Sequence, residues 1–224
     1  MAPRTAKERL PPISRLPCAR VAAPRHWTPR SAAARTLELL REEGTRAAAA
    51  GVLAETFYRR LALLERPLSE PLDEFGSSLS FRELSAADID ELGDHGPPDE
   101  FERRFAGGHL CLTGALDGRV VTFLWAARHE APVDYLGCSL RLEEQELYLY
   151  DTRTVPDLRG RDFATACWAY AVRRFKAAGQ ARLLAAVLPE NRAGLRPPEK
   201  VGFRRIGTIG RVGAAGRWVC FRRA

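Results

Sequence analysis

The sequence has no apolar run approaching the roughly 20 residues that a membrane-spanning helix needs. It also has no apolar segment near its N-terminus followed by a small-residue cleavage site, which is the pattern of a secretory signal. These two absences predict a protein without a membrane span and without a secretory signal.

The five cysteines are scattered along the chain, and no two of them form a C-x-x-C pair. This pattern favours neither a disulfide framework nor a zinc site. Most of the cysteines stand in apolar segments, where a thiol behaves as a small core side chain. We therefore expect a reducing, cytoplasmic setting and no metal cofactor.

The 224 residues are 46% hydrophobic and 28% charged, which is typical of a globular protein with a buried core. The net charge of +7 is distributed unevenly: residues 1–35 carry +7, residues 36–152 carry −12, and residues 153–224 carry +12. A basic C-terminal third predicts an anionic partner, such as a phosphorylated small molecule or nucleic acid. The alternative is a solvated, arginine-rich face. The sequence contains no base-reading motif, which disfavours nucleic acid.

The chain divides into three regions. Residues 1–30 are rich in Pro, Arg and Ala and lack periodicity, which predicts a disordered basic tail, with an organellar targeting peptide as the alternative. Residues 31–78 are expected to form a helical extension, with helix from Ser31 to Glu65 that either packs on the main domain or docks on a partner or membrane surface. Its apolar positions recur at helical spacing: Leu53, Phe57, Leu61 and Leu64. The main domain then covers residues 79–224.

The main domain has the pattern of an α/β (α+β) fold. Apolar and alternating runs predict strands at 79–84, 109–116, 119–128, 146–155, 182–188, 203–212 and 217–222. Helices are expected at 161–178 and from Asn191, and residues 131–144 are expected to be a loop. Asp117-Gly118 between two strand-like runs predicts a hairpin. This order indicates a mixed sheet of six or seven strands with helices on both faces.

Residues 150–165 (YDTRTVPDLRGRDFAT) carry the clearest chemical signal. A strand ends at Val155-Pro156, a turn rich in Arg and Gly follows, and a helix begins. The unpaired backbone amides of a helix start, together with the helix dipole, bind phosphate. Arg159 and Arg161 add charge-assisted donors. The segment therefore predicts a site for a diphosphate.

Residues 154–164 (TVPDLRGRDFA) resemble the acetyl-CoA-binding motif V-x-P-x-x-R/Q-G-x-G-x-G/A of the GNAT superfamily, the GCN5-related N-acetyltransferases. Residues 191–203 (NRAGLRPPEKVGF) are similar to its second signature, in which an Asn opens a helix that runs to a Gly-Phe pair. The resemblance covers residues 79–224 and implies a GNAT-like acyl-CoA N-acyltransferase fold. It also implies acetyl-CoA, or another acyl-CoA, as co-substrate and a small-molecule or peptide amine as acceptor, and it leaves a homodimer open.

The resemblance further implies where the donor binds. The pantetheine arm pairs with the strand end at Thr152–Val155, where the sheet opens, and Asn191 hydrogen-bonds it. The pyrophosphate lies on the amides of Arg159–Thr165. The cofactor-binding residues implied are Thr152, Arg153, Thr154, Val155, Arg159, Gly160, Arg161, Asp162, Phe163, Ala164, Thr165 and Asn191. The amine attacks the thioester directly, and catalysis comes from positioning and from a backbone amide that polarises the carbonyl.

Two residues depart from the motifs. Asp162 stands at the third glycine, and Pro198 stands where a Tyr often protonates the leaving thiolate. Pro197 and Pro198 together predict a short or broken helix after Asn191. A catalytically degenerate GNAT-fold binding or regulatory protein is therefore the alternative to an enzyme. Transfer of a longer acyl group is a further alternative.

A general base is expected on the strand that precedes the motif. Asp151 lies just before the pantetheine site, and Glu146 begins the same strand. Either carboxylate can take a proton from an ammonium group through water. The alternative for each is a surface carboxylate or an ion pair with neighbouring arginines. His109 and His129, at strand ends, are weaker candidates.

Overall fold

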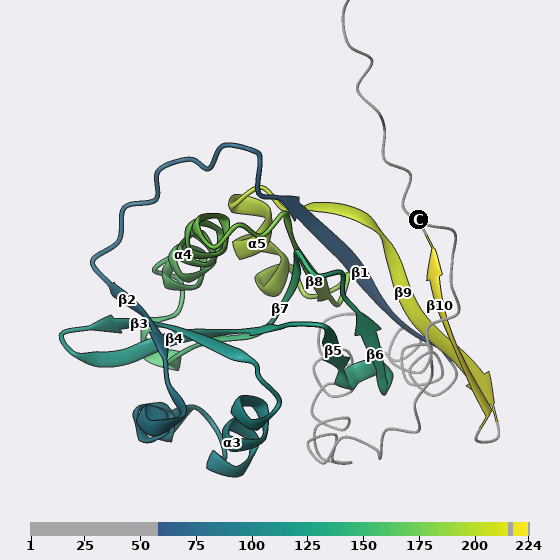
Figure 1. The fold of residues 1–224 in the computed structure, drawn as a ribbon, viewed down its shortest axis with the longest axis horizontal. Coiled ribbons are helices and arrows are strands. Elements are labelled where there is room, and N and C mark those ends of the chain that lie inside the picture. The colour runs from purple at the N-terminus through teal and green to yellow at the C-terminus, as the bar shows by residue number, and fades with distance from the viewer. Residues whose placement is uncertain (1–57, 215–216, 224) are drawn as a thin grey trace, which may run out of the picture.

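The computed structural model describes residues 58–214 and 217–223. Its centre is a mixed eight-stranded sheet in the order β10-β9-β1-β8-β7-β4-β3-β2 (Figure 1). The strands are β1 (Tyr58–Pro67), β2 (Ser80–Leu84), β3 (Leu110–Leu116), β4 (Arg119–Ala127), β7 (Glu146–Thr154), β8 (Arg182–Val187), β9 (Arg204–Ala214) and β10 (Arg217–Arg223). Among these eight described strands, β7 and β8 are paired in parallel, and the other neighbouring pairs are antiparallel.

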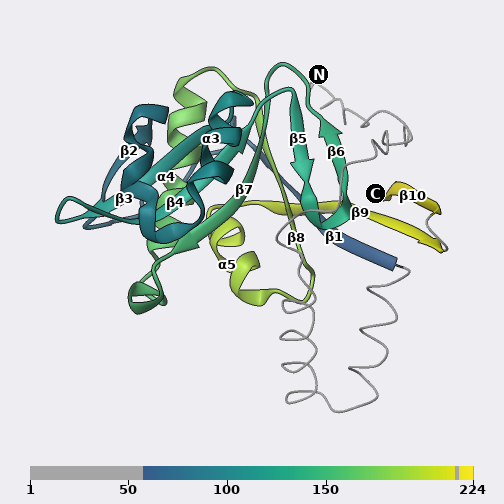
Figure 2. The same ribbon diagram turned by 90° about the horizontal axis from the view of Figure 1, so that it is seen from below.

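Two sets of elements cover the two faces of this sheet (Figures 1 and 2). One face carries α4 (Phe163–Ala177) and α5 (Arg192–Lys200), and the other carries the 3-10 helix η1 (Ala86–His95), α3 (Pro98–Ala106) and a hairpin of β5 (Glu130–Val133) and β6 (Cys138–Arg141). The core under α4 includes the buried Trp168 and Phe175. The opposite face has two separate apolar clusters, one under the β5–β6 hairpin and one under α3.

The sequence prediction was wrong for Tyr58–Pro67. The helix expected as far as Glu65 is instead the strand β1, which lies between β8 and β9. Leu61, Ala62, Leu63 and Leu64 are all buried, because a strand inside the sheet is covered on both faces. A short apolar run of this kind also satisfies helical periodicity, so the pattern could not separate the two structures. This strand accounts for an eight-stranded sheet where six or seven strands were expected.

The loop expected at residues 131–144 was also wrong in part, since it contains most of the β5–β6 hairpin. The hairpin at Asp117-Gly118 is confirmed, because Leu116 pairs with Arg119 and both turn residues have positive φ, +50° and +83°. The strand pair that ends the chain is confirmed as β9 and β10. The basic tail at 1–30 and the part of the helical extension at 31–57 lie outside the described residues.

Helix α5 is short, with nine residues, but it is not broken by Pro197 and Pro198. The side chain of Asn191 caps it by accepting a hydrogen bond from the amide of Gly194 at 2.9 Å. The two prolines lack only the two N–H groups that would donate backbone hydrogen bonds in the middle turn. The helix closes with Val201 N–H donating to the Pro197 carbonyl. Within residues 58–214 and 217–223, no helix is long and apolar enough to cross a membrane.

Candidate functional site

The sheet opens at the C-terminal end of β7. The parallel ladder between β7 and β8 runs from Glu146 paired with Arg182 to Leu149 paired with Ala185, and it ends there. β7 continues to Thr154 along β4, while β8 continues to Val187 along β1. Figure 2 shows the two strands diverging beyond this point. The peptide groups on the β8 side of β7 after Leu149 are thus left without a partner in the β7–β8 ladder.

A β-bulge accompanies this opening. On β4, Phe123 pairs with Arg153 and Trp125 pairs with Tyr150, so two residues of β7 face one residue of β4. One of the two, Asp151, has the left-handed φ of +46°, which Asp tolerates better than most residues. A bulge bends its strand and increases the local twist. It therefore turns β7 away from β8.

The carboxylate of Asp151 lies in a cluster of ion pairs. It accepts hydrogen bonds from Arg104 Nη1 at 2.6 Å and from Arg153 Nε at 2.8 Å. Arg104 also forms an ion pair with the buried Glu100 one turn earlier on α3. Asp151 thus links α3 to the bulge. These contacts are those of the ion pair with neighbouring arginines that the sequence offered as the alternative to a general base. Its role as a base stays a prediction.

Glu146, the second candidate base, lies at the other end of β7. It is buried, and its carboxylate accepts hydrogen bonds from Arg182 and from the Glu143 amide. Arg182 in turn reaches Glu65 on β1 at 3.1 Å. Six residues of extended strand separate Glu146 from Thr152, about 20 Å along β7. Glu146 therefore holds the paired end of β7 and β8 together and is remote from the opening.

The turn between β7 and α4 has the geometry of an amide-lined cradle. A single 3-10 turn, Pro156–Leu158, leads into Gly160, whose φ of +79° favours glycine and whose Cβ position faces open space. Arg159 and Arg161 are exposed on this turn. The side chains of Phe163 and Thr165 point into the protein and are buried. The backbone N–H groups of residues 163–165 belong to the first turn of α4, which has no intrahelical acceptors.

Asp162 does not plug this cradle. It is the N-cap residue of α4 with a left-handed φ of +58°, and its side chain makes no capping hydrogen bond to a backbone amide. Its carboxylate is 69% exposed and accepts a hydrogen bond from Lys200 Nζ at 2.6 Å. The hydrogen bond from Lys200 lowers the pKa of Asp162. The negative charge that replaces a motif glycine is thereby compensated by a lysine from the end of α5.

The residues expected to contact pantetheine border the opening from two sides. Thr152 Oγ1 accepts a hydrogen bond from Trp168 Nε1 on α4 at 2.9 Å, which ties the strand end to the helix. Thr154 Oγ1 lies 3.1 Å from Thr122 Oγ1 on β4. Asn191 uses Oδ1 to cap α5, and its Nδ2 donors remain for a ligand. Binding of pantetheine by these residues stays a prediction.

On the face opposite α4 lies a cluster of which the sequence indicated only His109, as a weaker candidate. His109 Nδ1 and Tyr150 Oη are 2.5 Å apart, and the guanidinium of Arg104 lies over the rings of Tyr150 and Trp125, 5.1 Å from each centroid. His109 lies just before β3, and Tyr150 lies on β7. The position of Tyr150, next to Asp151 and the motif, was the only sequence signal for it.

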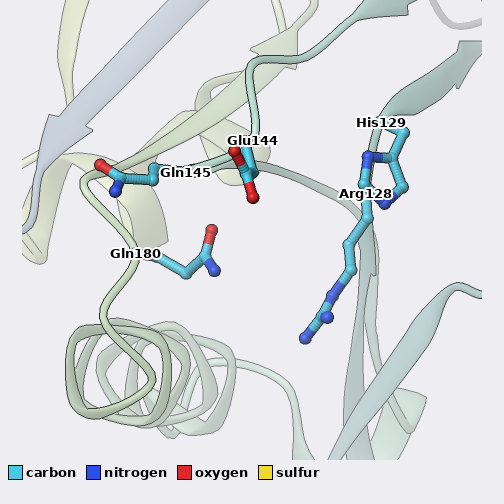
Figure 3. Close-up of a pocket in the computed structure, with 5 residues that line it drawn as sticks. All are labelled: Arg128, His129, Glu144, Gln145 and Gln180. Carbon is cyan, nitrogen blue, oxygen red and sulfur yellow. The ribbon is translucent and has the colours of Figure 1, made fainter.

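A cavity of about 360 Å³ lies at the other end of the parallel strands (Figure 3). The polar side chains that line it come from the loops before β5, β7 and β8: Arg128, His129, Glu144, Gln145 and Gln180. His129 is therefore separated from the opening by the length of β7. Among the described residues, no group of three or more His, Cys, Asp and Glu side chains is arranged to hold a metal ion.

Comparison with known proteins agrees with this architecture. The model of the acetyltransferase (GNAT) family matches residues 79–203, which is more than half of the chain, and the chain therefore belongs to the GNAT acetyltransferase family. The resemblance seen in the two motifs is thus confirmed. A search of curated proteins finds no match.

Solved structures share the fold at low sequence identity. A Drosophila protein has a TM-score of 0.50 and 11% identity over 81% of this chain and 57% of its own. A GCN5-related glucosamine N-acetyltransferase region of a fungal multi-domain β-N-acetylglucosaminidase has a TM-score of 0.50 and 13% identity over 80% of this chain and 23% of its own. A GNAT-family acetyltransferase from Novosphingobium aromaticivorans has a TM-score of 0.48 and 17% identity over 74% of this chain and 66% of its own. The chain thus spans less than two thirds of the length of each of these proteins.

Proposed function

We propose that this GNAT-family protein is an N-acetyltransferase that moves the acetyl group of acetyl-CoA to an amine by direct attack on the thioester. The observation that carries the proposal is the end of the β7–β8 ladder at Leu149 and Ala185, beside a helix start whose amides Asp162 leaves uncapped. Strand-edge peptide groups suit the amide-containing pantetheine arm, and the helix start suits the diphosphate. A thioester held in the opening is then accessible from the opposite face of the sheet.

The chain's own residues supply binding and orientation on the donor side. The backbone amides from Gly160 to Thr165, with the exposed guanidinium groups of Arg159 and Arg161, receive the phosphates. The strand edge at Thr152–Thr154, which lies beyond the end of the β7–β8 ladder, and the side chain of Asn191 receive the arm. A backbone N–H of β7 polarises the thioester carbonyl, and fixing the two reactants supplies most of the rate enhancement.

Acetyl transfer forms one bond and breaks one. The amine nitrogen bonds to the carbonyl carbon, the carbon–sulfur bond breaks, and CoA leaves as a thiolate that takes up a proton. A thiol with a pKa of about 8.5, as in free cysteine, is a good enough leaving group to depart without a dedicated acid. The absence of a tyrosine at Pro198 is therefore compatible with catalysis.

Titration calorimetry with acetyl-CoA tests the donor site. We expect one molecule bound per chain, with weaker binding in the Arg161→Ala variant and unchanged binding in the matched Arg173→Ala variant, which removes an exposed arginine from the middle of α4. Failure to bind acetyl-CoA at millimolar concentration would reject the proposal.

Release of free thiol in the presence of amines tests the reaction. The panel contains glucosamine, because the fungal relative is named for that acceptor, together with polyamines, aminoglycosides and peptides with a free N-terminus. Thiol release that depends on one class of amine identifies the acceptor. Binding of acetyl-CoA without thiol release from any amine would instead support the degenerate binding or regulatory protein. Competition between thioesters of different chain length tests transfer of a longer acyl group.

A further inference from the structure

We propose that Tyr150 and His109 form the proton relay of this acetyl transfer, with Tyr150 Oη accepting the proton of the acceptor amine and passing its own proton to His109 Nδ1. The inference rests on the proposed function and assigns to the acceptor side two residues that the binding motifs do not include. It supplies the base that the ion-paired carboxylates of Asp151 and Glu146 do not readily provide.

The position of Tyr150 in β7 places this residue beside the opening. It is the first residue of β7 beyond Leu149, the last residue that pairs with β8. Its partner on β4 is Trp125, whose side chain packs under α3, so the Tyr150 ring projects from the face opposite α4. The ring packs against both apolar clusters of that face. Tyr150 therefore lies on the acceptor side of the opening.

Burial and nearby charges set the protonation states of Tyr150 and His109. Burial raises the pKa of Tyr150, and burial together with the Arg104 cation lowers the pKa of His109. At neutral pH the phenol therefore keeps its proton and the imidazole is neutral. In the tautomer protonated on Nε2, which the relay requires, Tyr150 donates and His109 Nδ1 accepts. This is the resting state that a relay needs, with Tyr150 Oη and His109 Nδ1 within hydrogen-bond distance.

Charged groups from each neighbouring element act on this pair. Arg104 on α3 lies over the Tyr150 ring and disfavours an imidazolium, while Asp134 at the tip of the β5–β6 hairpin favours it. The Arg104 cation lowers the pKa of the Tyr150 phenol, while Asp151 and Asp134 raise it. The Asp151 carboxylate also binds Arg104 and so limits the field that Arg104 exerts on His109. His109 is thus neutral at rest and accepts a proton only during the transfer.

The proton balance closes within the site. When the amine nitrogen bonds to the acetyl carbon, it must lose one proton, which moves to Tyr150 Oη as the phenolic proton moves to His109 Nδ1. The carbon–sulfur bond breaks, and its electron pair leaves with the thiolate. Return of the proton from His109 through Tyr150 to the thiolate or to water restores the resting pair. The substrates supply every atom in this sequence, and no oxidant or reductant is needed.

Histidine-selective NMR tests the pair without an acceptor. We expect His109 to carry its proton on Nε2, with Nδ1 unprotonated and a pKa below 6.5. In the Tyr150→Phe variant, the Nδ1 signal and the pKa of His109 should both shift, whereas the matched Tyr170→Phe variant, which alters a tyrosine on α4, should leave them unchanged. A proton on Nδ1, or a His109 signal indifferent to Tyr150→Phe, overturns the relay.

Kinetics with the amine found by thiol release provide the second readout. General base catalysis contributes about 10²–10⁴-fold, so Tyr150→Phe should lower kcat by at least about 10²-fold with little change in the KM for acetyl-CoA. His109→Gln should do the same and should remove the acid limb of the pH–rate profile, while Tyr170→Phe keeps both. Unchanged turnover in Tyr150→Phe overturns the relay alone, whereas failure to bind acetyl-CoA overturns the proposed function itself. If the protein binds acetyl-CoA but acetylates no amine, the relay is also overturned, because the proposed role of Tyr150 and His109 is proton transfer during amine acetylation.

Discussion

Leu149 and Ala185 form the last pair of the one parallel ladder among the described strands, and two residues after Leu149 a bulge at Asp151 turns β7 away from β8. The opening between the strands therefore has a local cause, an extra residue in one strand held by two arginines. Its two faces differ. One presents the start of α4, which suits an anionic donor, and the other presents Tyr150, His109 and Arg104.

The Asp162→Gly variant should bind acetyl-CoA with an affinity within about tenfold of the wild type, which is 1.4 kcal/mol. The carboxylate is exposed and paired with Lys200, so removing it changes the charge at the cradle little. Glycine also adopts the φ of +58° at that position without strain. Titration calorimetry measures the change. An affinity that rises a hundredfold or more would show that Asp162 blocks the native site.

Leu63→Ala and Leu64→Ala should each lower the free energy of unfolding by about 2–5 kcal/mol in urea denaturation. The two residues are consecutive, each is 2% exposed, and they belong to different apolar clusters on opposite faces of the sheet. Only a strand buries both neighbours in this way. The control is Arg60→Ala, which loses an exposed ion pair with Glu190 and should cost no more than about 1 kcal/mol. A large effect of only one leucine would contradict the strand.

Thr152→Val should lower the free energy of unfolding by about 1–3 kcal/mol, because it leaves the buried Nε1–H of Trp168 without its acceptor. A cycle with Trp168→Phe and the double variant isolates the hydrogen bond from the loss of ring volume. The effects of the two single changes should not add. Strict additivity would show that the hydrogen bond contributes nothing.

The free energy of unfolding should decrease on acidification, in part because of His109. Because the pKa of His109 is lowered in the folded protein, the unfolded chain binds more protons between that pKa and about 6.5, the value for free histidine. The free energy of unfolding should therefore decrease as the pH falls from 6.5 and level off once the folded-state pKa is passed. Denaturation of wild type and His109→Gln at pH 7.5 and pH 5 measures this difference. Parallel losses in the two proteins would refute the assignment to His109.

Features that depend on neighbouring residues were predictable from the sequence. The Asp117-Gly118 hairpin, the turn from Pro156 into α4 and the capping position of Asn191 are set by short motifs whose backbone preferences act over a few residues. The motifs at residues 154–164 and 191–203 predicted the GNAT family, and the family model that matches residues 79–203 confirms it.

Contacts between distant segments were decided only by the tertiary structure. An apolar run at Tyr58–Pro67 became a strand because β8 and β9 offered it two edges, a choice that its own periodicity leaves undetermined. Asp162 was neutralised by a lysine 38 residues away, and Tyr150 received a histidine partner 41 residues away. Such pairings leave no local sequence pattern, because they join residues far apart in the chain. The conformational entropy lost in closing the intervening loops is offset only by the contacts of the assembled sheet.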